Sequence, residues 1–211
     1  MTGDPTQCPT DGGCSSCKPM TRALAWSGIA IAALLPALFS VLPGAAQPWN
    51  LSVIGALALF VAARLNFTQA FLFTAIAIIA KDASIYAVRG YGWEPYPLSW
   101  VFFLGYVGIG WAFLRRTDSP VKIGGAALSA SLLFFVVSNF ASWLEQSLPY
   151  GYSLAGLADC FAAGVPFYRG TLIGDLAFTG VLFGAHAVLS AVYFPAERVV
   201  PVQITEEPRD L

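Results

Sequence analysis

Long apolar runs are the sequence feature that most limits how this chain can fold. The first runs from Ala23 to Leu42 and, as a helix rising about 1.5 Å per residue, matches the roughly 30 Å hydrocarbon core of a bilayer. Only 11% of the 211 residues are charged and 57% are hydrophobic, whereas soluble domains carry about 25% charged residues. The sequence therefore predicts an all-α integral membrane protein.

The apolar runs divide into six predicted transmembrane helices. Residues 51–80 are too long for one ordinary span, and Arg64 and Asn66 separate a short helix from a third helix that begins near Phe67. The predicted helices cover residues 23–42, 51–64, 67–88, 98–114, 124–144 and 171–194.

A shorter helix is expected between the fifth and sixth spans. Ser153 is a suitable N-cap residue, and the proline ring of Pro166 is expected to end the helix. Such a helix would be about 18 Å long, which is too short to cross the bilayer. We therefore predict a re-entrant or interfacial lid.

The distribution of Lys and Arg predicts the orientation, because cytoplasmic loops are enriched in both. With six spans and the N-terminus inside, eight of the eleven basic residues lie in the cytoplasm, and only Lys81, Arg89 and Arg169 lie outside. Both termini are therefore expected in the cytoplasm. The predicted parts are a disordered tail (1–22), a transmembrane domain (23–194) and a second cytoplasmic tail (195–211).

Three cysteines, Cys8, Cys14 and Cys17, lie in the first tail. Their thiolates could bind zinc or an iron–sulfur centre, but a tetrahedral structural site needs four ligands and no His is nearby. A reduced tail is the expected alternative, so no metal site and no cofactor is predicted. The sequence assigns these cysteines no role.

Polar side chains recur along one face of the last helix. Asp175, Thr179, Leu182 and His186 are spaced i, i+4, i+7 and i+11. Because Asp175 and His186 would lie about 16 Å apart along the axis, they are too distant to act as a catalytic pair. Each is either a functional contact, given the cost of ionisable groups in lipid, or an interhelical hydrogen-bonding group. The role of His186 stays open.

A second polar group is expected near the outer end of the fifth helix. Asn139, Trp143 and Gln146 share one face there, and an amide beside an indole suits a small polar or heteroaromatic ligand. The alternative is an interfacial aromatic residue with a polar cap. The lid would bring Asp159 and Cys160 to the same mouth, with Cys160 as a small packing residue because no His adjoins it.

Small residues follow a small-xxx-small pattern in two helices. In the first helix the pairs are Gly28 with Ala32 and Ala33 with Ala37, and they serve either internal packing, which is favoured, or docking to another subunit. Two further pairs in the last helix, Gly170 with Gly174 and Gly180 with Gly184, predict close packing of that helix against protein.

Several function classes are excluded or disfavoured. The sequence contains no Walker A, GxSxG, HExxH or dinucleotide-binding motif, so another subunit would have to supply ATP-derived energy. The net charge of −1 offers no basic surface for nucleic acid.

Motifs in the last third of the chain carry a resemblance to a known family. They are NF-x-x-W (Asn139, Phe140, Trp143), GL-x-x-C (Gly156, Leu157, Cys160), PF (Pro166, Phe167) and TL-x-GD (Thr171, Leu172, Gly174, Asp175). Together with residues 55–65 and the region of Asp82, this pattern resembles a family of uncharacterised bacterial membrane proteins over most of residues 45–190. That family is itself similar to the substrate-capture (S) components of energy-coupling factor (ECF) importers.

The resemblance implies a function and a location. S components are six-helix proteins of the bacterial inner membrane that bind vitamins, cofactor precursors or metal ions from outside, and they dock through their first helix to a coupling subunit driven by two ATPases. By this likeness, Asp82, Asn139, Trp143, Asp159 and Asp175 are the expected ligand contacts around one outward-facing hollow. Gly28, Ala32, Ala33 and Ala37 are the expected docking residues.

We therefore expect a substrate-capture subunit that performs no catalysis and contacts a small ligand, the lipid bilayer and a coupling subunit. The first alternative is a non-transporting membrane assembly or scaffold protein. The second is an intramembrane enzyme that uses Asp175 with Asp159 or Cys160.

Overall fold

The computed structural model describes residues 18–40, 51–90, 97–115, 117–145 and 149–195, and over these ranges it is all-helical. Its helices are α1 (Pro19–Ser40), α2 (Ile54–Arg64), α3 (Phe67–Arg89), α4 (Pro97–Phe113), α5 (Pro120–Leu144) and α6 (Leu154–Val192). Four of them, α1, α3, α5 and α6, are long and apolar enough to cross a membrane, whereas α2 and α4 are shorter apolar helices. The chain is therefore a multi-pass membrane protein.

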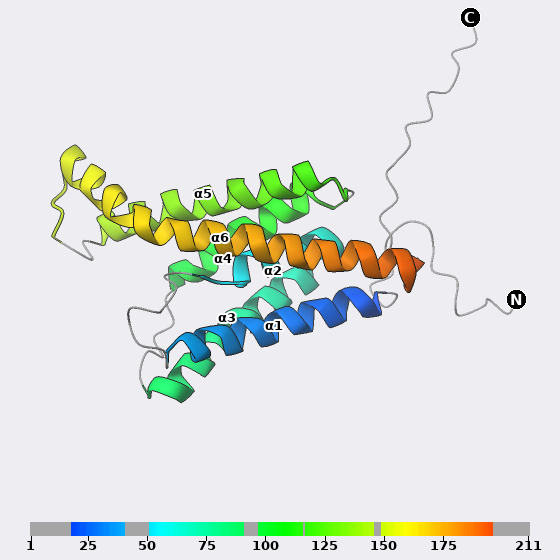
Figure 1. The fold of residues 1–211 in the computed structure, drawn as a ribbon. Helices are drawn as coiled ribbons and strands as arrows, with labels where there is room; N and C mark the ends of the chain where they lie inside the picture. The colour runs from blue at the N-terminus through cyan, green and yellow to red at the C-terminus, as the bar shows by residue number, and fades with distance from the viewer. Residues whose placement is uncertain (1–17, 41–50, 91–96, 116, 146–148, 196–211) are drawn as a thin grey trace, which may run out of the picture.

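The helices lie side by side along one axis (Figure 1), with α1 packed on α3, and α5 packed on α6. The start of α1 and the end of α6 lie at the same end of this bundle. At that end Lys18 Nζ donates a hydrogen bond to the Arg64 carbonyl oxygen (2.6 Å), and the Arg64 guanidinium donates to the Thr117 carbonyl oxygen (3.3 Å). We call it the basic end, after Lys18, Arg22, Arg64, Arg115 and Lys122.

Helix α2 is the centre of the bundle. All 11 of its residues are buried, and it contacts each of the other five helices. At about 16 Å it is too short to cross the hydrocarbon core alone. Its apolar surface continues around the whole helix, as expected for a helix surrounded by protein. Helix α4 approaches it closely at Gly110, where a Cβ atom would lie 2.7 Å from the Leu59 carbonyl oxygen.

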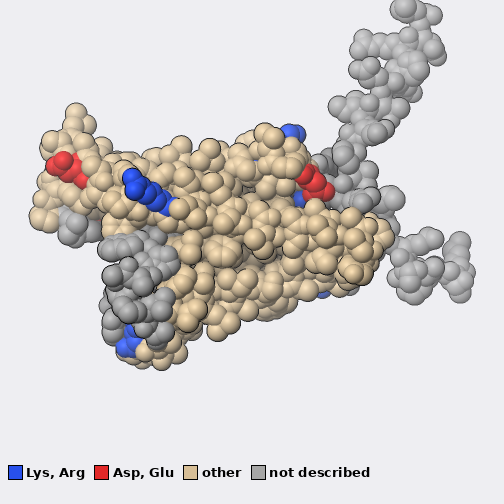
Figure 2. All heavy atoms as spheres, in the orientation of Figure 1, with Lys and Arg blue, Asp and Glu red and all other residues tan. Residues whose placement is uncertain are grey.

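The surface of the bundle is mostly apolar. Large hydrophobic side chains on α1, α3, α5 and α6 are exposed, among them Leu34, Ile79, Leu132 and Val181. Figure 2 shows charged atoms toward the two ends and a broad uncharged band between them. A bilayer is the environment that makes such a surface favourable, because soluble proteins rarely expose apolar patches of this extent.

The predicted break between a lid helix and the last span is wrong. Ser153 does cap the helix, accepting a hydrogen bond from the Gly156 backbone N–H (3.0 Å), but α6 continues through Pro166 to Val192. A proline removes one backbone hydrogen bond and bends a helix without ending it where the neighbouring bonds persist. The first turns of α6 are inclined to the rest in Figure 1, as this bend requires.

Two smaller predictions about helix ends also change. Helix α1 begins at Pro19, so the predicted tail 1–22 overlaps it, and α5 begins at Pro120 rather than Gly124. Proline suits the first helical turn because its missing N–H would have no partner there. Cys8, Cys14, Cys17, Gln146 and residues 196–211 lie outside the described residues.

Candidate functional site

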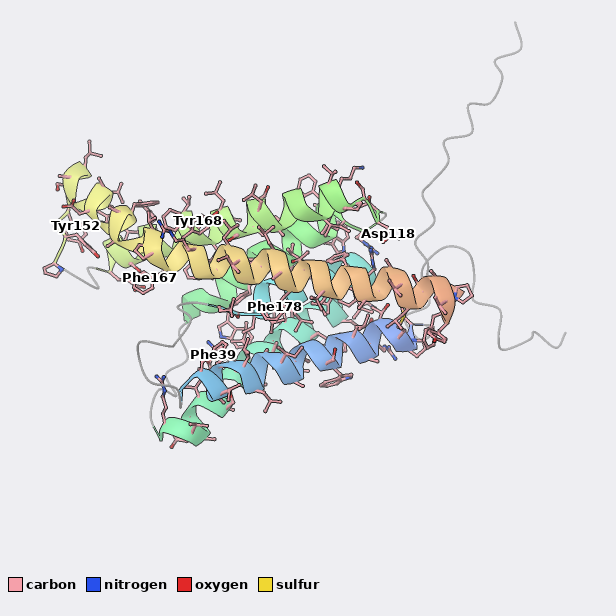
Figure 3. All side chains as sticks on the ribbon, viewed as in Figure 1. Phe39, Asp118, Tyr152, Phe167, Tyr168 and Phe178 are labelled. Atoms are coloured by element: carbon pink, nitrogen blue, oxygen red, sulfur yellow. The ribbon has the colours of Figure 1, made fainter. Side chains whose placement is uncertain are left out.

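A cavity of about 340 Å³ lies between the second half of α5 and the first half of α6. It is at the end of the bundle opposite the basic end. In Figure 3, Phe167 and Tyr168 lie in the part of α6 that is far from Asp118, which is at the basic end. Five aromatic rings line it: Phe134, Phe135, Tyr150, Phe167 and Tyr168. Its polar lining residues are Ser138, Asn139, Ser142, Cys160 and Thr171.

Helical spacing explains how α6 lines the cavity. Cys160, Gly164, Tyr168 and Thr171 recur every three or four residues and therefore share one face. The same spacing continues into the predicted face 175–186, where Asp175, Thr179, Leu182 and His186 are all buried. One continuous face of α6 thus lines a cavity in its first half and packs in the protein interior in its second half.

Aromatic contacts hold the walls of the cavity in place. The ring centroid of Phe135 lies 4.8 Å from that of Tyr168 and 5.6 Å from that of Phe161. Phe134 contacts Phe102 edge to face, with centroids 5.4 Å apart. Rings fixed by other rings present a preformed apolar surface, which is typical of small-molecule sites.

Asn139 is the predicted ligand contact that does line the cavity. Its Nδ2 donates to the Phe135 carbonyl oxygen (2.8 Å), and Cys160 Sγ donates to the Asn139 carbonyl oxygen (3.3 Å). The amide faces Gly164, where a Cβ atom would lie 2.2 Å from Asn139 Oδ1. Glycine at this position therefore allows α6 to approach the amide.

Asp175 lies one helical turn beyond Thr171 but is not among the residues that line the cavity. It is only 3% exposed, and its Oδ2 accepts a hydrogen bond from the Tyr106 hydroxyl (2.5 Å). Ser131 is fully buried as well. A Cβ atom on Gly55, in the first turn of α2, would lie 2.3 Å from Asp175 Oδ1, so the carboxyl group is tightly enclosed.

The other three predicted contacts lie elsewhere. Trp143 Nε1 donates to the Gly151 carbonyl oxygen (3.0 Å), which ties the end of α5 to the connection before α6. Asp159 is exposed, and Asp82 is paired with Lys81 (2.8 Å). The structure therefore brings Asn139 and Cys160 together but does not gather the predicted carboxylates around one hollow.

The predicted docking residues of α1 are divided between the interior and the surface. Gly28 and Ala32 are buried, and a Cβ atom on Gly28 would lie 2.8 Å from Leu57 Cδ1. Ala33 and Ala37 are partly exposed. Gly28 and Ala32 therefore agree with internal packing, the alternative that the sequence favoured.

The glycine pairs of α6 also behave differently from each other. Gly174 packs closely, since its Cβ atom would lie 3.0 Å from the Ser52 carbonyl oxygen. Gly180 and Gly184 have open space instead, and they line a second, mostly apolar hollow of about 250 Å³ beside α5. Helix α6 packs against α5 and α2, as predicted, but Gly180 and Gly184 are exposed and make no close approach themselves.

His186 is buried near the basic end, with its ring centroid 5.7 Å from that of Phe60. Neither ring nitrogen has a hydrogen-bond partner within the part of the chain that the structure describes. Arg64 lies nearby, with its guanidinium carbon 5.0 Å from the centroid of the Phe183 ring. His186 does not contribute to the cavity.

The sequence reasoning missed Tyr106, the partner of Asp175, and the aromatic wall. One signal for the wall was present: Ser131, Phe135, Ser138 and Ser142 follow helical spacing along α5, as the polar face of α6 does. Applied to α5, the same test would have found one side of the cavity.

A known family matches most of the chain. Residues 19–199 match the model of a family of unknown function (DUF6580). No curated protein and no solved structure matches the chain significantly.

Proposed function

The chain belongs to the DUF6580 family, whose function is unknown, and from the site itself we propose that it captures a small micronutrient as the substrate-binding subunit of an ECF-type importer. The cavity between α5 and α6 is the observation that carries this proposal. It has the size of a small-molecule site, and it combines aromatic walls with a few polar groups.

The position of the cavity supports capture from outside. The cavity lies at the end of the bundle opposite the basic end, where Asp118 pairs with Arg64. If the basic end faces the cytoplasm, as the positive-inside rule predicts, the cavity faces the outer side. Tyr150, from the connection between α5 and α6, would then lie at the entrance.

Import would require partner subunits. The chain has no ATP-binding motif, so a transmembrane coupling subunit with ATPases would supply the energy. Of the four α1 residues first expected to dock, Ala33 is partly exposed, and we propose that it forms part of such a contact.

The test is to purify the full chain in mild detergent and to record native mass spectra of the intact protein and of any molecule it releases. Ser142→Phe places a ring at the half-buried cavity wall, and Ser129→Phe makes the same change at an exposed position of α5 outside the cavity. We expect a small molecule to be released from the wild type and from Ser129→Phe, but not from Ser142→Phe.

An empty wild-type protein that also shows no thermal shift across a panel of vitamins and nucleobases would argue against capture. The same observation would favour the second candidate, a non-transporting scaffold. A specific feature supports that candidate: Asp175 and Asp82, two of the ionisable groups expected to bind ligand, are engaged with Tyr106 and Lys81.

A further inference from the structure

We infer that the α5–α6 cavity selects an uncharged, ring-bearing ligand that donates hydrogen bonds, and that it rejects carboxylates, ammonium groups and metal ions. This inference rests on the proposed function and narrows the micronutrient to one chemical class. It follows from the charge, the hydrogen-bond directions and the size of the cavity.

Charge is the first property of the cavity that restricts the ligand. None of the described residues that line the cavity is charged. The charged residues nearest to them along the helices, Glu145, Asp159 and Arg169, are exposed at the surface, and Asp175 is buried against Tyr106. A charged ligand would lose part of its hydration without gaining a counter-charge from the lining residues, and removing an unpaired charge from water is costly. An uncharged ligand avoids this cost.

Metal ions are disfavoured for the same reason. Zinc binds through thiolate, imidazole or carboxylate groups, and proteins hold the hard divalent cations chiefly through carboxylate oxygens. Cys160 is the only one of these groups among the described lining residues. Its Sγ donates to a backbone carbonyl, as a protonated thiol does. The described residues contain no group of three His, Cys, Asp or Glu placed to hold a metal.

Hydrogen-bond directions indicate which polar groups remain for the ligand. Asn139 Nδ2, Ser138 Oγ and Thr171 Oγ1 all donate to carbonyl oxygens of their own helices, at 2.8, 3.3 and 3.5 Å. Each of these side chains keeps oxygen lone pairs that can accept further hydrogen bonds. The Ser138 and Thr171 hydroxyls have given their single hydrogen to these bonds and are left as acceptors, whereas Asn139 Nδ2 keeps a second hydrogen to donate. A ligand with N–H or O–H groups satisfies the two hydroxyl acceptors.

The size of the cavity limits the ligand to a small ring system. At about 30 Å³ per water molecule, a volume near 340 Å³ holds about a dozen non-hydrogen atoms. That is one ring with a short polar substituent, or two fused rings. The rings of Phe134, Phe135 and Tyr168 provide surfaces against which it stacks.

The experiment first identifies any molecule that the purified protein releases. It then measures thermal shifts with four matched probes at pH 7: benzamide, N,N-dimethylbenzamide, benzoate and benzylamine, with Mg²⁺ as a fifth. The proteins are the wild type, Ser142→Phe and Ser129→Phe. We expect release of a neutral ring compound, and a shift of several degrees with benzamide in the wild type and Ser129→Phe but not in Ser142→Phe.

A hydrogen-bond variant tests the donor requirement. Thr171→Val keeps the shape of the side chain but removes its acceptor oxygen. Losing one neutral hydrogen bond should lower the affinity for benzamide about two- to tenfold. The affinity for N,N-dimethylbenzamide should stay unchanged, because this probe has no N–H group to donate. An equal loss with both probes would overturn the donor assignment.

The outcomes separate this inference from the proposed function. Release of an anionic, cationic or metal ligand that Ser142→Phe abolishes would overturn the inference and leave substrate capture standing. If the protein releases no molecule, a larger thermal shift with benzoate, benzylamine or Mg²⁺ than with benzamide would also overturn the inference and leave substrate capture standing. A protein that releases nothing and responds to no probe would overturn both.

Discussion

The two halves of the α5–α6 interface use polar side chains in opposite ways. In the cavity half, formed by residues 134–142 and 160–171, polar and aromatic groups surround a hollow. In the other half, which we call the sealed half, Ser131 of α5 and the α6 residues Asp175, Thr179 and His186 are at most 3% exposed, and the hollow of about 250 Å³ beside this half is mostly apolar. The comparison teaches that the cost of a polar group in a membrane does not by itself mark a ligand site.

Helix α2 accounts for the burial of the sealed half. Gly55 in its first turn contacts Asp175 and Tyr106, and Phe60 packs against Phe183 with ring centroids 5.4 Å apart. Because α2 is only about 16 Å long, it lies beside only this half of α6. Because every residue of α2 is buried, the side of α6 that packs on α2 has no surface for a hydrated ligand.

The substitution with the largest expected effect on this comparison is Gly55→Ala in the sealed half. The new Cβ atom would lie 2.3 Å from Asp175 Oδ1 and 2.5 Å from Tyr106 Cε1, and overpacking of this kind costs about 1–3 kcal/mol. The control is Gly180→Ala, where nothing lies within 4 Å. Reversible unfolding in mixed micelles measures both. Equal stabilities would mean that the sealed half is loosely packed.

A double-mutant cycle on Tyr106→Phe and Asp175→Asn has the next largest expected effect. The hydrogen bond that joins these side chains is buried, and such bonds in membrane proteins contribute about 0.6 kcal/mol on average, with a maximum near 1.7 kcal/mol. We expect a coupling energy in that range and unchanged ligand affinity for both single variants. A tenfold loss of ligand affinity in Asp175→Asn would show that Asp175 belongs to the binding site.

Gly164→Ala should show the reverse behaviour in the cavity half. Its Cβ atom would lie 2.2 Å from Asn139 Oδ1, so the end of the amide side chain must move, at a cost of less than about 1 kcal/mol in stability. Because the amide faces the cavity, ligand affinity should fall about tenfold. Gly125→Ala is the matched control, because nothing lies within 4 Å of its new Cβ atom. If Gly125→Ala lowered the ligand affinity equally, the loss in Gly164→Ala could not be assigned to Asn139.

The smallest effect is expected for Trp143→Phe. This change removes the hydrogen bond from Trp143 Nε1 to the Gly151 carbonyl oxygen, worth about 0.5 kcal/mol at a half-exposed position. Hydrogen exchange should accelerate at residues 149–153 and stay unchanged in α2. Faster exchange throughout the bundle would show that Trp143 supports the fold as a whole.

Much of the fold could be predicted because it depends on local pattern. The apolar runs place α1 to α5 to within a few residues, the helical spacing identifies the buried face of α6, and the Ser153 cap is confirmed. The break at Pro166 could not be predicted correctly from the residue alone, because a proline ends a helix or only bends it according to the packing of both flanking segments.

The candidate site could be predicted only in part. Asn139 was found because its spacing places it near the end of one helix. The partner of Asp175 was not found, because Tyr106 is 69 residues away along the chain. No local periodicity records such a pair.

The sequence by itself determined that this chain is a bundle of apolar membrane helices with polar groups on particular helical faces, because composition and periodicity act within single helices. The tertiary structure alone decided which of those polar groups meet one another and which border a cavity. The reason is physical: these contacts depend on how each helix is rotated and shifted against its neighbours, and α2 fills the interior along only one half of α6.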